Sequence, residues 1–227
     1  MRGVFITGTD TGVGKTWFAE KLIHTLSANI DNINIQPRKP VESGCINNDD
    51  ILLPADAIKL QTACKEEIDL DVICNFKFAE PLAPPEAAKL HNVNLTIQSL
   101  YDACKAGICD DDFLIVEGAG GFFSPIANDG LNADLAKKLK LPVILIADDR
   151  LGAINQVLLS CKAIEQYNLK VAGIVLNSKD GASTKVLNND YYIQQYIDAN
   201  ILPVSKDAIC DKNILTTIIK TLIKKDA

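Results

Sequence analysis

Short runs of apolar residues alternate along this chain with longer segments in which apolar residues recur every three or four positions. The short runs predict strands at residues 3–7, 33–41, 113–117, 142–147 and 171–177. They lack a clean alternation of apolar and polar positions, which indicates strands buried on both faces of a helix-covered parallel sheet. The longer segments predict amphipathic helices, including residues 16–27 and 154–167. We therefore expect an α/β protein with a doubly wound, mostly parallel sheet and helices on both faces.

Length, charge and cysteine content narrow the class of protein. The 227 residues suit one domain spanning residues 1–227. Lysine and arginine number 23 against 29 acids, a net charge of −6, and no cationic block is present, so we expect no nucleic-acid partner. Seven cysteines without a Cys-x-x-Cys pair, and two distant histidines, favour a reducing cytosol over a disulfide framework or zinc site. Because its apolar runs are too short for a signal peptide or membrane span, we expect a cytoplasmic protein without membrane association.

The stretch GTDTGVGKT, residues 8–16, follows the first predicted strand and has the composition of a phosphate-binding loop. Five residues separate Gly8 from Gly14, where the usual pattern has four. Backbone N–H groups in such a turn, together with the helix N-terminus, can hold a polyphosphate. Lys15 would then contact the β- and γ-phosphates and Thr16 a Mg²⁺ ion. The alternative is a turn that only caps a helix, a role that requires no lysine followed by threonine.

Two acidic residues are candidates for holding a metal ion beside this loop. Glu117 ends the apolar run FLIVE, and the glycines Gly118, Gly120 and Gly121 behind it allow the backbone to approach a ligand. A glycine-rich strand end with a solvated glutamate is the alternative interpretation. Asp56 could ligate the metal or act as the N-cap of the following helix, and its spacing alone favours the cap.

The stretch RKPVESG, residues 38–44, places a lysine at the end of the second predicted strand. Pro40 would end the pairing of that strand, so the ammonium group of Lys39 is expected to point into the crevice where α/β proteins bind ligands. Beside the phosphates it would be a second cation. A lysine with a plain surface role is the alternative.

In their order along the chain, these motifs resemble those of the dethiobiotin synthetase family, ATP-dependent enzymes of biotin synthesis. The matching motifs are GTDTGVGKT (8–16), KPVESG (39–44), DAIKLQ (56–61), FAEPLAP (78–84), VEGAGG (116–121) and LGAINQVLL (151–159). The longer loop spacing is this family's own variant. The resemblance implies that 7,8-diaminopelargonate, CO₂ and MgATP give dethiobiotin, ADP and phosphate. One amine would form a carbamate that accepts the γ-phosphoryl group, and the second amine would close the cyclic urea.

The resemblance also implies which residues bind ATP and magnesium. The triphosphate would be held by Gly12, Val13, Gly14, Lys15 and Thr16. The Mg²⁺ ion would be held by Thr16, Asp56 and Glu117, which replaces the interpretation of Asp56 as a cap. The backbone facing the phosphates and the substrate would be that of Gly118, Ala119, Gly120 and Gly121. The base end of ATP would be bound by Asn177, Ser178, Pro203, Val204 and Ser205, although Asn177 could also belong to an ordinary strand-ending turn.

Substrate binding and catalysis follow from the resemblance in the same way. Lys39, Ser43 and Thr11 would contact the amine and carbamate end, and catalysis would depend on Lys15, Lys39 and Thr11. In the family, the segment matching GAIN crosses a dimer interface and binds the substrate carboxylate at a helix N-terminus. The corresponding residues Gly152, Ala153, Ile154 and Asn155 therefore imply a homodimer.

Two other classes of protein share parts of this pattern. Synthetases that amidate corrinoid side chains share the loop but usually carry a glutaminase domain, for which this chain has no room. Partition and division-site ATPases resemble KGGVGKT, with a lysine where this chain has Asp10, and often end in an amphipathic membrane tail. Residues 213–227 could imitate such a tail, but their sparse cationic face favours a helix that packs on the protein.

Overall fold

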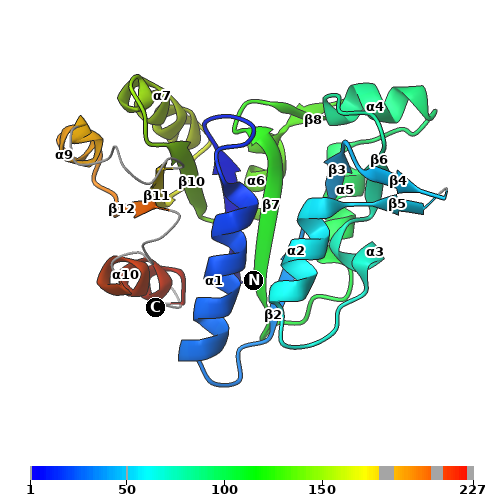
Figure 1. Cartoon of the computed structure of the whole chain (residues 1–227), viewed down its shortest axis with the longest axis horizontal. Coiled ribbons are helices and arrows are strands. Elements are labelled where there is room, and N and C mark those ends of the chain that lie inside the picture. Colours follow the sequence, from blue (N-terminus) through cyan, green and yellow to red (C-terminus); the bar gives the residue numbers. More distant parts are fainter. Residues whose placement is uncertain (1, 50, 179–186, 206–211, 224–227) are drawn as a thin grey trace.

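Six parallel strands form a sheet at the centre of the protein (Figure 1). The structure is a computed structural model that describes residues 2–49, 51–178, 187–205 and 212–223. The strand order is β12-β11-β10-β1-β7-β2, and every neighbouring pair is parallel. The strands are β1 (Arg2–Gly8), β2 (Ile35–Arg38), β7 (Phe113–Gly121), β10 (Val143–Asp148), β11 (Val171–Ser178) and β12 (Ile201–Ser205). The predicted doubly wound, parallel sheet is confirmed.

Helices contribute apolar side chains to a core on each face of this sheet. On one face these are α1 (Lys15–Asn29), α2 (Ala55–Ala63), α3 (Leu70–Ile73) and α10 (Lys212–Ile223). On the other face these are α4 (Pro84–Leu90), α5 (Ile97–Lys105), α6 (Asn132–Leu139), α7 (Ala153–Gln166) and α9 (Asn189–Gln194). The predicted helices at 16–27 and 154–167 are confirmed as α1 and α7.

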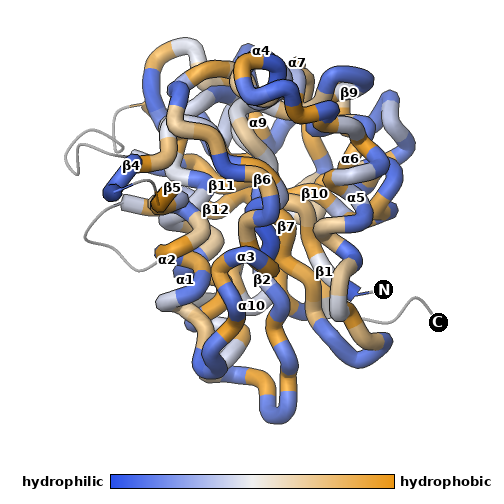
Figure 2. Tube along the Cα trace, turned by 90° about the vertical axis from the view of Figure 1, so that its right-hand side faces the viewer, coloured by the Kyte–Doolittle hydropathy of each residue, from blue (hydrophilic) through white to orange (hydrophobic). Residues whose placement is uncertain are grey.

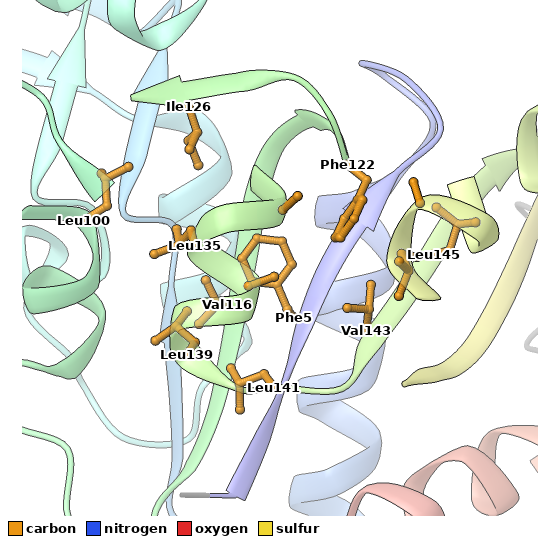
Figure 3. Close-up of a cluster of buried hydrophobic side chains, with 14 of the residues drawn as sticks. Phe5, Leu100, Val116, Phe122, Ile126, Leu135, Leu139, Leu141, Val143 and Leu145 are labelled. Carbon is orange, nitrogen blue, oxygen red and sulfur yellow. The ribbon is translucent and has the colours of Figure 1, made fainter. Parts of the chain in front are cut away.

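Successive residues of the central strands enter different cores, which explains the uninterrupted apolar runs. In β7, Phe113 and Ile115 pack with α1 and α2, whereas Leu114 and Val116 pack with α5 and α6. Figure 3 shows Phe5 and Val116 among the side chains of the second core. Apolar residues follow the central strands, and polar residues gather in the outer loops (Figure 2). Burial on both faces therefore removes the in-and-out alternation of a half-exposed strand.

Short strands form three further pairs outside the central sheet. These are β3 (Val41–Ser43) with β6 (Phe76–Phe78), β4 (Ile46–Asn48) with β5 (Ile51–Leu53), and β8 (Pro125–Ala127) with β9 (Gly130–Leu131). The sequence did not predict these pairs, because two or three residues, mostly exposed in β4 and β5, carry no readable pattern. In Figure 1, β4 and β5 project away from the sheet.

Two strands of the central sheet differ from the prediction, and proline is involved in both. The predicted strand 33–41 is too long: β2 ends at Arg38, and the chain resumes as β3, which pairs elsewhere. Pro40 lies between them, and proline cannot donate to a ladder. The sequence did not predict β12, because Pro203 interrupts an already short apolar run. Both β2 and β12 are edge strands, where a proline is tolerated.

The C-terminal helix α10 packs on the sheet as predicted. Leu215, Ile218 and Leu222 are buried in the core that contains α1. The side chains of Ile214 and Ile223 lie outside the described residues. Among the helices that the structure describes, none combines the length and the apolar character needed to cross a membrane.

Candidate active site

A cleft of about 720 Å³ opens where β1, β2 and β7 end. The connection from β7 to β10 passes β1, so the winding of the sheet changes direction beside β1. Crevices at such points are the usual ligand sites of α/β proteins. The predicted site residues that line the cleft are Thr11, Gly12, Gly14, Lys15, Thr16, Lys39, Ser43, Asp56, Glu117, Ala119 and Gly120. The cleft lining thus brings together residues from five of the six motifs, which are distant from one another in sequence.

The loop between β1 and α1 has the backbone conformation of an anion site. Gly12 and Gly14 have φ angles of 70° and 102°, which favour glycine. A Cβ atom on Gly14 would lie 2.2 Å from Nδ2 of Asn177, which donates a hydrogen bond to the carbonyl of Val13 (2.9 Å). Helix α1 begins without a side-chain cap and without an acid in its first turn. Its first N–H groups can therefore bind an anionic ligand.

Lys15 is a buried cation at this helix start. The residue is 6% exposed, and its ammonium group donates to the backbone carbonyl of Asp10 (2.9 Å). The described residues form no salt bridge with it. Burial, and then the charge of Lys39, lowers the pKa of Lys15 to about 8. An anion bound in the loop would supply the counter-charge that the protein itself does not place in contact with this ammonium group.

Lys39 is buried in a cluster of charged side chains, so its interpretation as a surface lysine is wrong. Its ammonium group lies 2.6 Å from Oε1 of Glu117 and 3.2 Å from Oδ2 of Asp56. The hydroxyl of Thr16 donates to the same Glu117 oxygen (2.9 Å). Burial alone would lower the pKa of Lys39, but Glu117 and Asp56 raise it above the usual lysine range. Lys39 therefore remains charged at neutral pH.

The donor set beside Lys39 fits a Mg²⁺ ion that binds together with a phosphate. The Oε2 atom of Glu117 is buried and has no hydrogen-bond partner among the described residues. Burial by itself would raise the pKa of Asp56, but Lys39, Thr16 and Lys59 together lower it below the usual value, so its carboxylate is ionised. No group of three or more His, Cys, Asp or Glu residues suited to a metal occurs in the described part of the chain. Mg²⁺ commonly takes one or two carboxylates and completes its shell with substrate phosphates and waters.

The helix cap that spacing favoured for Asp56 comes from a different residue. Pro54 occupies the N-cap position of α2 and offers no side-chain acceptor, so the interpretation of Asp56 as the cap is wrong. The carboxylate of Glu42 accepts hydrogen bonds from the backbone N–H of Asp56 (2.9 Å) and that of Ala57 (3.1 Å). Sequence reasoning missed Glu42, because no local pattern connects it with a helix 14 residues further on.

Asn132 is a second residue that sequence reasoning missed. It is fully buried and accepts a hydrogen bond from the N–H of Ala119 (3.0 Å). Its amide group donates to the carbonyls of Ala119 (2.7 Å), Gly121 (3.0 Å) and Ser124 (3.1 Å). A Cβ atom on Gly118 would lie 2.4 Å from its Oδ1 atom, so that glycine is needed for close approach. Asn132 thus shapes the glycine-rich backbone beside the cleft.

The segment Gly152, Ala153, Ile154 and Asn155 does not line this cleft. It forms the start of α7, where Gly152 and Asn155 are exposed, Ala153 is buried, Gly152 has a φ angle of 90° and no side chain caps the helix. The preceding Leu151 is 85% exposed. Within one chain, the structure does not bring these four residues to the phosphate loop.

The residues assigned to the base end of ATP meet where β11 and β12 end. Asn177 pairs with Val204 and Ser178 pairs with Ser205 in the parallel ladder, and Pro203 precedes them. None of the five lines the cleft, but Asn177 contacts the phosphate loop through Val13. They occupy the same edge of the sheet as the cleft, on the opposite side of β1 from Lys39.

Several known proteins are similar to this chain in sequence. A family model described as an AAA domain matches residues 2–208. The ATP-dependent dethiobiotin synthetase BioD of Vesicomyosocius okutanii is 40% identical over 226 residues, which cover 99% of this chain and 100% of that protein. The protein of the same name from Thermodesulfovibrio yellowstonii is 31% identical and covers 97% of this chain and 98% of its own.

Among solved structures, a ParA family ATPase from Chlorobium tepidum matches with a TM-score of 0.52. The match covers 97% of this chain and 90% of that chain, at 15% identity, and shows the shared fold alone. The relatives at 31% and 40% identity span nearly the whole chain, and they carry the name that the motif order indicated. The chain therefore belongs to the ATP-dependent dethiobiotin synthetase family.

Proposed function

We propose that this protein closes the ring of 7,8-diaminopelargonate with CO₂ to give dethiobiotin, converting ATP to ADP and phosphate. It would act as a single cytoplasmic domain that pairs into a homodimer and uses Mg²⁺. One observation carries the proposal: two buried lysines, Lys15 and Lys39, face one cleft together with the carboxylates of Asp56 and Glu117. A phosphate-binding loop by itself requires only the first of these lysines.

The phosphate end of the reaction belongs to the loop before α1. The backbone of Gly12, Val13 and Gly14 would bind the triphosphate, and Lys15 would neutralise its charge. Thr16, Asp56 and Glu117 would hold the Mg²⁺ ion, as the unpartnered oxygen of Glu117 suggests. When bound, Mg²⁺ supplies charge neutralisation on the transferred phosphoryl group.

The acceptor end belongs to the residues around Lys39. A substrate carbamate is an anion, and it must approach a second anion, the γ-phosphate. The charged ammonium group of Lys39 would orient the carbamate and screen this repulsion, with Thr11 and Ser43 beside it in the cleft. Phosphoryl transfer of this kind depends on positioning and electrostatics, which two fixed cations supply. The backbone of Gly118, Ala119, Gly120 and Gly121 would border both groups.

The substrate carboxylate and the base are bound away from this centre. Gly152, Ala153, Ile154 and Asn155 would bind the carboxylate of the substrate in a partner chain, which is supported by the uncapped N-terminus of α7, where Gly152 and Asn155 are exposed. Asn177, Ser178, Pro203, Val204 and Ser205 would bind the base end of ATP. Their position on the same sheet edge as the phosphate loop supports this assignment.

The test is product detection by mass spectrometry from purified protein, Mg²⁺, ATP, bicarbonate and 7,8-diaminopelargonate. Dethiobiotin should form one-for-one with ADP, and only in the complete mixture. ATP hydrolysis that is indifferent to the diamine would contradict the proposal and favour a switch ATPase.

A further inference from the structure

Glu42 is a buried carboxylate of the cleft to which the proposed reaction assigns no part. It lies in β3, three residues after Lys39, and its side chain is part of the cleft lining. The residue is 7% exposed. Both carboxylate oxygens accept hydrogen bonds, and both donors are backbone N–H groups in the first turn of α2, those of Asp56 and Ala57.

Helix α2 depends on this outside cap. Pro54 at its N-cap position has neither a side-chain acceptor nor a backbone N–H of its own. The first N–H groups of a helix have no partner within the helix, and a negative charge at that end is favourable. A carboxylate that reaches across from β3 therefore sets where α2 begins and ties it to the strand that follows Lys39.

The capped turn carries a proposed metal ligand. The N–H that Glu42 binds at 2.9 Å belongs to Asp56, whose own carboxylate lies 3.2 Å from the ammonium group of Lys39. Lys39 in turn lies 2.6 Å from Glu117. Glu42 and Lys39 thus hold Asp56 from two sides, one through its backbone and one through its side chain.

We propose that Glu42 is a positioning residue that holds the Asp56 carboxylate in place for the metal bound with the nucleotide. This inference rests on the proposed metal site and adds to it a residue that does not touch the metal. Groups that orient a metal ligand typically change metal affinity 10–100-fold when they are mutated. For Glu42→Gln, which keeps the shape but loses one acceptor oxygen, we expect about a tenfold effect.

The experiment uses nucleotide affinity, which does not depend on dethiobiotin formation. Trp17 is the chain's only tryptophan and lines the cleft, so its fluorescence can report binding. The dissociation constant of a non-hydrolysable ATP analogue is measured in EDTA and in saturating Mn²⁺. The constant in EDTA divided by the constant in Mn²⁺ gives the contribution of the metal to binding, and this quotient is the ratio used below. Glu42→Gln should reduce that ratio about tenfold while leaving the affinity in EDTA within about twofold of wild type.

A double-mutant comparison tests whether Glu42 acts through Asp56. In an Asp56→Asn background, adding Glu42→Gln should change the ratio by less than about twofold, because the carboxylate to be positioned is already absent. Glu86→Gln is the matched control, since it removes an exposed acid from the first turn of α4 outside the cleft lining, and its ratio should equal that of wild type.

Three results would overturn the inference. These are an unchanged ratio in Glu42→Gln, an equal loss of affinity with and without metal, and a full tenfold loss that persists beside Asp56→Asn. If the ratio falls as expected but no dethiobiotin is formed by the wild-type protein, the proposed reaction fails and the role of Glu42 stands.

Discussion

Helices α1 and α7 begin in the same way, but their surroundings differ. Each starts after a glycine with positive φ, Gly14 at 102° and Gly152 at 90°, and neither has a side-chain cap or an acid in its first turn. Around Gly14, Asn177 leaves no room for a Cβ atom, and the next residue is the buried Lys15. Around Gly152, only Arg150 would come within 4 Å of a Cβ atom.

The two uncapped helix N-termini thus differ in what surrounds them. The N-terminus of α1 is enclosed by residues of its own chain and is equipped with a buried cation. The N-terminus of α7 is open, with Leu151 85% exposed beside it. The N-terminus of a helix attracts anions, but discrimination between anions requires surrounding side chains. At α7 these would come from a second copy of the chain in the proposed dimer.

The largest effect is expected at Lys39, which lines the same cleft as the enclosed N-terminus of α1. Lys39→Gln leaves Glu117 and Asp56 without their buried counter-charge and removes the cation at the acceptor end. We expect the rate of dethiobiotin formation to fall roughly a thousandfold at saturating substrates. The exposed Lys162, on α7, is the matched control, and Lys162→Gln should have the rate of wild type. Near wild-type turnover in Lys39→Gln would remove Lys39 from the mechanism.

The two helix starts can be compared directly by replacing each glycine with alanine. In Gly14→Ala the new methyl group would clash with Asn177 and strain the loop, so ATP affinity should fall roughly a hundredfold. In Gly152→Ala the methyl group has space, and ATP affinity should remain that of wild type. Fluorescence titration of Trp17 measures both. Equal losses of ATP affinity in Gly14→Ala and Gly152→Ala would contradict the assignment of ATP binding to the start of α1 alone.

A smaller effect is expected when a charge is placed beside the open helix end. Leu151→Asp should weaken the proposed dimer and raise the KM for 7,8-diaminopelargonate about tenfold, with ATP affinity unchanged. Sedimentation and steady-state kinetics report the two consequences separately. Leu90→Asp alters another exposed leucine, on α4, and should change neither quantity. A Leu151→Asp protein that stays dimeric with an unchanged KM would argue against a partner chain at α7.

The smallest effect concerns stability. Gly152→Ala places a side chain at φ 90°, so the free energy of unfolding should fall by about 1 kcal/mol in urea denaturation. Gly107 also has positive φ, at 70°, with no atom within 4 Å of an added Cβ, and Gly107→Ala should lose about as much. A loss at Gly152 several times larger than at Gly107 would mean that the start of α7 is more constrained than its open surroundings indicate.

Much of the fold could be predicted because its determinants are local. Buried strands appear as continuous apolar runs, and the phosphate loop appears as glycines between such a run and an amphipathic helix. The prediction was wrong where tertiary position decided the outcome. At β12, for example, Pro203 is compatible with a strand only because that strand lies at the sheet edge. The end of β2 at Arg38 and the separate pairing of β3 likewise depend on which neighbours are available.

By itself, the sequence determined the fold class, the phosphate loop and the membership of a family, because each depends on residue types in a short or ordered pattern. Only the tertiary structure decided which groups meet. Lys39 and Glu117 are 78 residues apart, and Thr16 and Glu117 are 101 apart, and the strand order brings them within 3 Å. The hydrogen bond by which Glu42 caps α2, and the one that Asn132 accepts from the backbone N–H of Ala119, arise in the same way. A chain's pattern specifies its elements, but side-chain contacts across elements exist only once those elements have packed.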